Sequence, residues 1–175
     1  MQNITDIGTG NDGVSTGAIV PIAEHAKWQP HWTIEKYDEN GNLYEVLDFE
    51  GNCLLNEGIT EMLNLIGGIS GTAFSNANAY IGIGESTTAA AATQTGLQGS
   101  TKTYKAMDTG YPSVSNQTIT YQAIFGENDA NYEWQEASIA NGNSDTAKNM
   151  NRKVHDMGRK AVGTTWIARC SITLS

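Results

Sequence analysis

The ten residues before the C-terminal serine alternate between apolar and polar side chains, and this pattern limits the fold more than any other feature. The apolar members recur at every second position and are Trp166, Ala168, Cys170, Ile172 and Leu174. Successive side chains of a strand point to opposite faces, so a period of two places these residues together. The pattern therefore predicts a β-strand over residues 165–174, with this set facing a core.

Two other regions carry the same alternation. Residues 31–49 are predicted to form a β-hairpin, because Asn40-Gly41 separates two alternating runs and Asn-Gly favours tight hairpin turns. Residues 118–140 are predicted to form a second hairpin around the polar loop 126–131, which is rich in Gly, Asn and Asp. A shorter strand is predicted over 79–84, and 99–107 is predicted to be an edge strand.

The composition agrees with a protein made of strands and turns. The chain has 175 residues, of which only 17% are charged and 19 are glycine. This length fits one domain with its own core. We expect a mainly β protein: residues 31–175 form an antiparallel β-sandwich or jelly-roll-like domain, and residues 1–30 form an extended N-terminal arm.

One segment has the periodicity of a helix. Ile59, Met62, Leu63 and Ile66 recur at spacings of three and four residues, which makes one apolar face over residues 56–66. Asn56 is the predicted N-cap, and the two glycines that follow Ile66 end the helix. We expect its apolar face to cover an open end of the β-core, because the polar face lacks the basic cluster of a membrane-surface helix.

The charge of the chain argues against two classes of partner. The net charge is −9 at pH 7, whereas nucleic-acid binding needs a basic surface and anionic membranes attract basic segments. The first 17 residues contain no basic segment followed by an apolar run, and no stretch has the length of a membrane span. We therefore expect a protein made in a cytoplasm, with no nucleic-acid or membrane partner.

The motifs of common active sites are absent from the sequence. The three histidines lack metal-ligand spacing, and the loop that begins at Asp38 lacks the Gly and Glu of a calcium loop. The sequence Gly82-Ile83-Gly84 lacks the third glycine of a dinucleotide fingerprint, so we interpret its glycines as packing or bulge positions. We predict no catalytic residue, no metal and no cofactor, and leave open whether Cys53 and Cys170 pair.

Several residues are candidates for an interface. Ile19, Val20 and Ile22 form a short apolar patch in an otherwise polar N-terminal segment. Trp28 and Trp32 are candidate contact residues, because tryptophan often anchors interfaces. Arg152 and Lys153 belong to a basic cluster in an acidic chain, which is either a solvated strand or a contact for an acidic neighbour. Tryptophans such as Trp134 also leave open a sugar-stacking platform.

From residue 54 onward, the order of segments resembles a family of small structural proteins of tailed bacteriophages. The segments that carry the resemblance are 55–63, 80–84, 85–97, 123–126, 134–141 and 165–174. They correspond to a glycine-terminated amphipathic helix, a strand like Tyr-Ile-Gly-Ile-Gly, a stretch rich in Ser, Thr and Ala, and three further strands. Ser138 stands where that family usually has glycine, and the N-terminal hairpin lies outside the resemblance.

The resemblance implies a virion component without enzymatic activity. Its first form is a head decoration (cement) protein that binds the major capsid protein, and its second is a tail, collar or fibre component that binds tail proteins. Either form implies a homo-oligomer, for which a trimer would fit. A carbohydrate-binding module is a third hypothesis, from a different class.

Overall fold

The structure is a computed structural model that describes residues 27–144 and 146–175. The described residues contain ten strands and one helix. The strands of the first half are β1 (Trp28–Tyr37), β2 (Leu43–Glu50), β3 (Cys53–Leu54), β4 (Tyr80–Gly84) and β5 (Lys102–Ala106). Those of the second half are β6 (Ser113–Ser115), β7 (Thr118–Phe125), β8 (Glu133–Ala140), β9 (Asn151–Arg159) and β10 (Thr165–Leu174). The helix α1 (Asn56–Ile66) follows β3.

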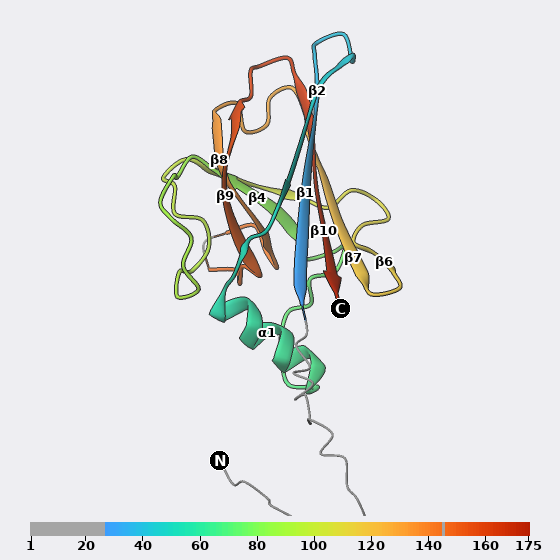
Figure 1. The fold of residues 1–175 in the computed structure, drawn as a ribbon, viewed down its shortest axis with the longest axis vertical. Helices are drawn as coiled ribbons and strands as arrows, with labels where there is room; N and C mark the ends of the chain where they lie inside the picture. Colours follow the sequence, from blue (N-terminus) through green and yellow to red (C-terminus); the bar gives the residue numbers. More distant parts are fainter. Residues whose placement is uncertain (1–26, 145) are drawn as a thin grey trace, which may run out of the picture.

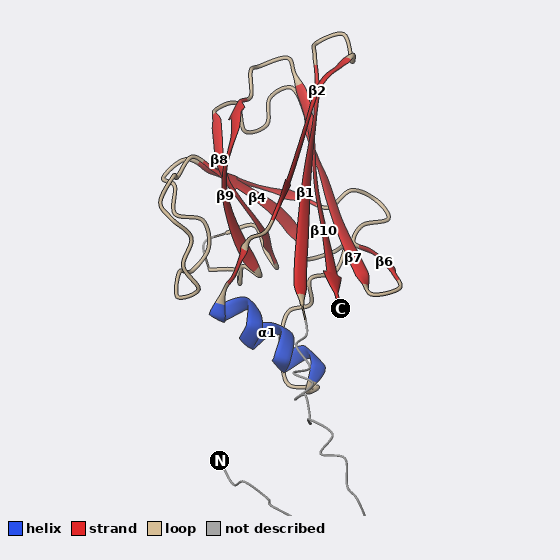
Figure 2. Ribbon diagram, in the orientation of Figure 1, coloured by secondary structure: helices blue, strands red, loops and turns tan. Residues whose placement is uncertain are grey.

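The strands form two antiparallel sheets that pack face to face (Figures 1 and 2). The first sheet has the order β2-β1-β10-β7-β6, and the second has the order β3-β9-β8-β4-β5. The helix α1 lies at the end of the sandwich where β10 finishes (Figure 1). The prediction of a mainly β antiparallel sandwich with one helix is confirmed.

The strand predicted from alternation forms the centre of the first sheet. β10 pairs with β1 on one side and with β7 on the other. Trp166, Ala168, Cys170 and Ile172 are buried, whereas Leu174 at the end of the strand is half exposed. The period of two was therefore correct for the four residues that have the opposite sheet above them.

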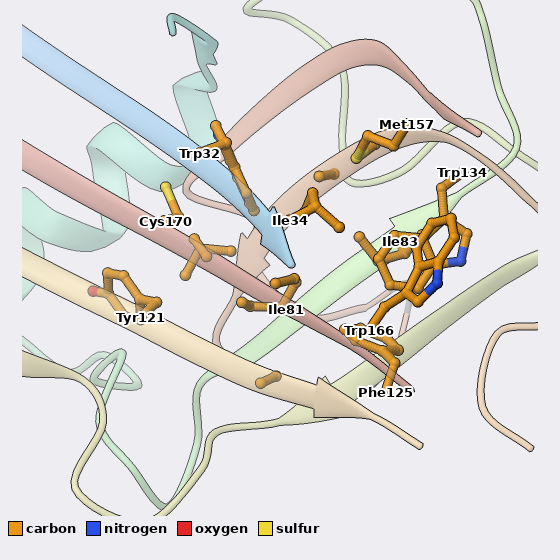
Figure 3. Close-up of a cluster of buried hydrophobic side chains, with 14 of the residues drawn as sticks. Trp32, Ile34, Ile81, Ile83, Tyr121, Phe125, Trp134, Met157, Trp166 and Cys170 are labelled. Atoms are coloured by element: carbon orange, nitrogen blue, oxygen red, sulfur yellow. The ribbon is translucent and has the colours of Figure 1, made fainter. Parts of the chain in front are cut away.

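The second predicted hairpin is wrong. β7 and β8 are consecutive strands of the expected extent, but β7 belongs to the first sheet and β8 to the second. The rings of Phe125 and Trp134 meet across the interior, with centroids 4.7 Å apart (Figure 3). Trp134 also contacts Trp166 edge-on at 4.8 Å. A connection that crosses from one sheet to the other buries these rings between the two layers, which a hairpin within one sheet would not do.

The first predicted hairpin is confirmed, and it begins earlier than expected. β1 and β2 pair around a turn in which Gly41 has a φ of 77° and the Asp38 carboxylate accepts hydrogen bonds from the backbone N–H groups of Asn40 and Asn42. Trp28 is already part of β1, where it pairs with Leu174 of β10. Residues 28–30 thus belong to the sandwich rather than to the arm, and the arm boundary predicted at residue 30 is too late.

The glycines of β4 are packing positions, as the sequence indicated. A Cβ atom at Gly82 would lie 2.8 Å from the Tyr104 ring, and a Cβ atom at Gly84 would collide with the Glu136 carboxylate. β4 lies between β5 and β8, which supply these two side chains. The missing side chains of β4 therefore leave room for the Tyr104 ring and for the buried carboxylate of Glu136.

The two cysteines are free in the structure. Cys53 is half-buried, and Cys170 is fully buried between the sheets, where burial raises the pKa of its thiol. The thiolate is the reactive form of cysteine. The burial of Cys170 and the raised pKa of its thiol therefore both protect it from reaction.

We therefore expect N-ethylmaleimide to add once to the native protein, at Cys53, and twice to the protein unfolded in guanidinium without reductant. Intact-protein mass spectrometry with peptide mapping gives both counts. Two rapid adducts in the native protein would contradict the burial of Cys170, and no adduct in the unfolded protein would reveal a disulfide.

Candidate interaction surface

The outward side of α1 exposes aliphatic residues to solvent. Leu63 is 60% exposed, Ile66 is 83% exposed, and Ile69, which follows the helix, is 63% exposed. We call these three residues the α1 surface. The inward side of the helix carries Met62 and Leu65, which pack against the core. The predicted apolar face thus contributes Met62 to the core, whereas Leu63 and Ile66 face away from it.

A glycine sets the close approach of α1 to the sandwich. Gly58 is buried, and a Cβ atom there would lie 2.5 Å from both the Cα and the carbonyl oxygen of Met150. The predicted N-cap at Asn56 is wrong, since Leu55 holds that position and makes no side-chain cap hydrogen bond. The predicted end of the helix is correct, and Gly68 takes a positive φ of 67°. Backbone contact with Met150 fixes the start of the helix in place of a capping side chain.

A groove of about 520 Å³ lies between α1 and the adjacent end of the first sheet. We call it the α1 groove. Its walls come from α1, β1, β6, β7 and β10, and include Trp28, Met62, Leu65, Val114, Ile119 and Leu174. These residues are brought together only by the fold, because five separate elements supply them. The groove opens beside the α1 surface, with which it shares Ile66.

The α1 groove has the chemistry of a site for an aliphatic chain. Its floor contains Phe74, Tyr121 and Ile172, each of which is less than a tenth exposed. Burial raises the pKa of Tyr121, so its phenol stays neutral over the physiological range. None of the described residues that line the groove carries a charge, and its polar members are amides and hydroxyls such as Asn116, Gln117 and Thr118.

The structure separates the two tryptophans that were predicted to make contacts. Trp28 is partly buried at the wall of the α1 groove, and its Nε1 donates a hydrogen bond to Asn52 Oδ1 at 3.1 Å. Trp32 is fully buried in the core, stacked on Phe49. The assignment of Trp32 as a surface contact is therefore wrong, because its side chain fills the space between the sheets (Figure 3).

The tryptophans do not form an exposed platform in the described part of the chain. Trp134 and Trp166 are no more than 1% exposed, and Trp32 is also buried. Stacking on a sugar ring requires an accessible aromatic face. The carbohydrate-binding hypothesis therefore loses these three tryptophans, and of the four only Trp28 keeps partial exposure.

The predicted basic contact is also not a surface patch. Arg152 is fully buried, and its Nε donates to Glu136 Oε2 at 2.6 Å. The Lys153 ammonium donates to the backbone carbonyl of Glu50 and lies 5.7 Å from the Phe49 ring centre. Arg152 was misassigned because its partner Glu136 lies on another strand, where it neutralises the charge in the interior.

The buried pair of Glu136 and Arg152 organises a loop. The Glu136 carboxylate accepts hydrogen bonds from the backbone N–H groups of Gln98 and Gly99, and Arg152 Nη1 donates to the carbonyl of Thr88. All three of these backbone positions lie in the connection between β4 and β5. The pairing of β8 with β9 is irregular between Trp134 and Glu136, so alternation along β8 gave no signal for this arrangement.

The described residues contain no cluster of three or more His, Cys, Asp or Glu side chains that could hold a metal ion. The one helix of the described residues, α1, has 11 residues, far fewer than a membrane span needs. Ile19, Val20 and Ile22 lie outside the described residues, so their predicted contact stays a prediction.

Comparisons with protein-family models, with curated proteins and with solved structures find no match to this chain. The geometry of the candidate surface is therefore the basis for its interpretation.

Proposed function

We propose that this chain is a structural protein of a tailed bacteriophage virion and that it decorates the head. The observation that carries the proposal is the α1 surface, where Leu63, Ile66 and Ile69 expose aliphatic side chains at one end of the sandwich (Figure 1). Contiguous exposed apolar residues mark interaction sites more often than isolated ones do. The order of the helix, the Ser-, Thr- and Ala-rich stretch and the closing strands supports the virion assignment.

A decoration role needs only binding energy. A protein that binds the assembled shell and not its separate subunits shifts the equilibrium toward the shell by mass action. The α1 surface would supply this energy by removing its aliphatic side chains from water, at about 25 cal/mol per Å² of buried apolar area. In this role, copies of the chain act as a homo-oligomer that contacts the major capsid protein.

The location is tested by immunogold labelling of intact phage particles with an antibody to this chain. We expect label over the whole icosahedral head. Label confined to one vertex or to the tail would overturn the decoration role and favour a tail, collar or fibre component. A lack of label on both intact and disrupted particles would overturn the virion assignment itself.

The contact surface is tested with two matched variants in a co-sedimentation assay on shells that lack this chain. We expect Ile66→Asp to weaken shell binding tenfold or more, because a carboxylate would be buried without a partner in an apolar contact. Val162→Asp is the control, since Val162 is 72% exposed in the turn between β9 and β10, away from α1. Equal binding by both variants would show that the α1 surface is not the contact.

A further inference from the structure

The α1 groove lies next to the point where the described chain begins. The backbone N–H of Lys27 donates to the carbonyl of Ser175 at 2.6 Å, and the N–H of Ser175 donates back to Lys27 at 3.2 Å. The next residues along both strands, Trp28 and Leu174, pair with each other and line the groove. The segment that precedes Lys27 therefore starts at the rim of the groove.

That segment contains an apolar sequence within reach. Ile19, Val20, Pro21 and Ile22 stand together, and Ile22 precedes Lys27 by five residues. Five residues span at most about 17 Å when fully extended. Because Trp28 is itself part of the wall, this reach covers the groove without any rearrangement of the sandwich.

The chemistry of the segment matches that of the groove. Three aliphatic side chains would meet walls that carry no charge, and the Asn116 and Gln117 amides at the rim offer partners to an extended backbone. Pro21 disfavours the helical conformation at Val20, which favours an extended segment. The chain has a net charge of −9, yet residues 13–23 contain no charged side chain.

We propose that residues 19–22 bind in the α1 groove of their own chain. A segment tethered five residues from the site has an effective concentration far above that of a second copy in solution, which favours the intramolecular contact. The bound segment would cover Val114 and Leu174, which are 71% and 50% exposed, and would extend the apolar area beside Ile66. This inference goes beyond the proposed function, because it applies to the isolated chain.

Crosslinking of cysteine variants tests the contact in the full-length protein. The background is Cys53→Ser, which removes the accessible thiol and keeps the buried Cys170. Val20→Cys is combined with Val114→Cys at the groove, and a short bis-maleimide is added. We expect an intramolecular link between positions 20 and 114, seen as a monomer on a denaturing gel and as a linked peptide by mass spectrometry.

Two controls separate binding from simple tethering. Val162→Cys replaces Val114→Cys in the first, because both residues are similarly exposed, at 71% for Val114 and 72% for Val162. Val114 lies in β6, whereas Val162 lies in the β9–β10 turn at the other end of the sandwich (Figure 1). The second adds Ile19→Asp and Ile22→Asp, which keep the tether but remove the apolar contact. We expect no link to position 162, and a rate of linking to position 114 at least tenfold lower with the aspartates.

Each other result would overturn the proposal. An unchanged rate with the aspartates would mean that position 20 reaches position 114 through tethering alone. A linked dimer would mean that the groove binds the arm of a neighbouring copy. A lack of any link between positions 20 and 114 would mean that residues 19–22 do not bind in the groove. None of these results depends on phage particles, so they are independent of the test of the proposed function.

Discussion

Arg152→Met is expected to lower the free energy of unfolding by about 3–5 kcal/mol, because it leaves the buried Glu136 carboxylate without its cation. Methionine fills much of the space of the arginine, so the loss comes from charge and hydrogen bonds rather than from a cavity. The substitution also removes the donors to the Thr88 carbonyl and to Gln94 Oε1. Urea denaturation followed by far-UV circular dichroism measures the change, which corresponds to roughly 10 °C in melting temperature.

Arg159→Met is the matched control. It removes a second arginine of β9 that pairs with a glutamate of β8, but Arg159 and Glu133 are 68% and 47% exposed and lie 3.7 Å apart. An exposed pair of this kind contributes less than about 1 kcal/mol. Similar losses for the two variants would show that the burial of the Glu136–Arg152 pair has no energetic consequence, and would refute the interpretation of the network.

Gly58→Ala is expected to destabilise the protein by about 1–3 kcal/mol through overpacking, although the same change in an exposed helix would stabilise it by about 1 kcal/mol. The change is destabilising because of the group that Gly58 contacts. The new methyl group would lie 2.5 Å from the Met150 backbone, which cannot rotate away as a side chain could. The helix has to shift outward, so the α1 groove should widen as well. Urea denaturation measures the loss of stability.

Asn64→Ala provides the comparison on the same helix. Asn64 is only partly buried and alanine has the higher helix propensity, so we expect this variant to be as stable as the wild type or slightly more stable. Binding of the dye 1-anilinonaphthalene-8-sulfonate should rise for Gly58→Ala alone. Stabilisation by Gly58→Ala would mean that α1 is not held against Met150.

The sequence predicted the strands better than their partners. Alternation identified β10, and Asn40-Gly41 identified the β1–β2 turn, because both signals depend on residues close together in the chain. The predicted pairing of β7 with β8 failed because it depends on residues far apart in the chain. Whether two consecutive strands pair or cross between layers depends on what Trp134 meets across the core, and one of its partners, Trp166, lies far along the sequence.

The candidate site was predicted only in part for the same reason. Residues near Arg152 look like a solvated basic segment until Glu136 is placed beside it, and periodicity alone did not show that Leu63 and Ile66 face away from the core. The α1 groove has no sequence signature, since five elements build it. Trp28 was the one described candidate contact that the fold places at this groove.

The order of the first sheet also bears on aggregation. β2 and β6 are its outer strands, and an outer strand with free backbone groups can pair with a strand of another molecule. β6 has only three residues, and β2 carries Glu45, Asp48 and Glu50 among its eight. Two β2 strands that approached each other would bring these carboxylates together, so growth by edge addition is disfavoured. The edges of the first sheet therefore favour contacts through its ends and faces, where a contact can be finite and specific.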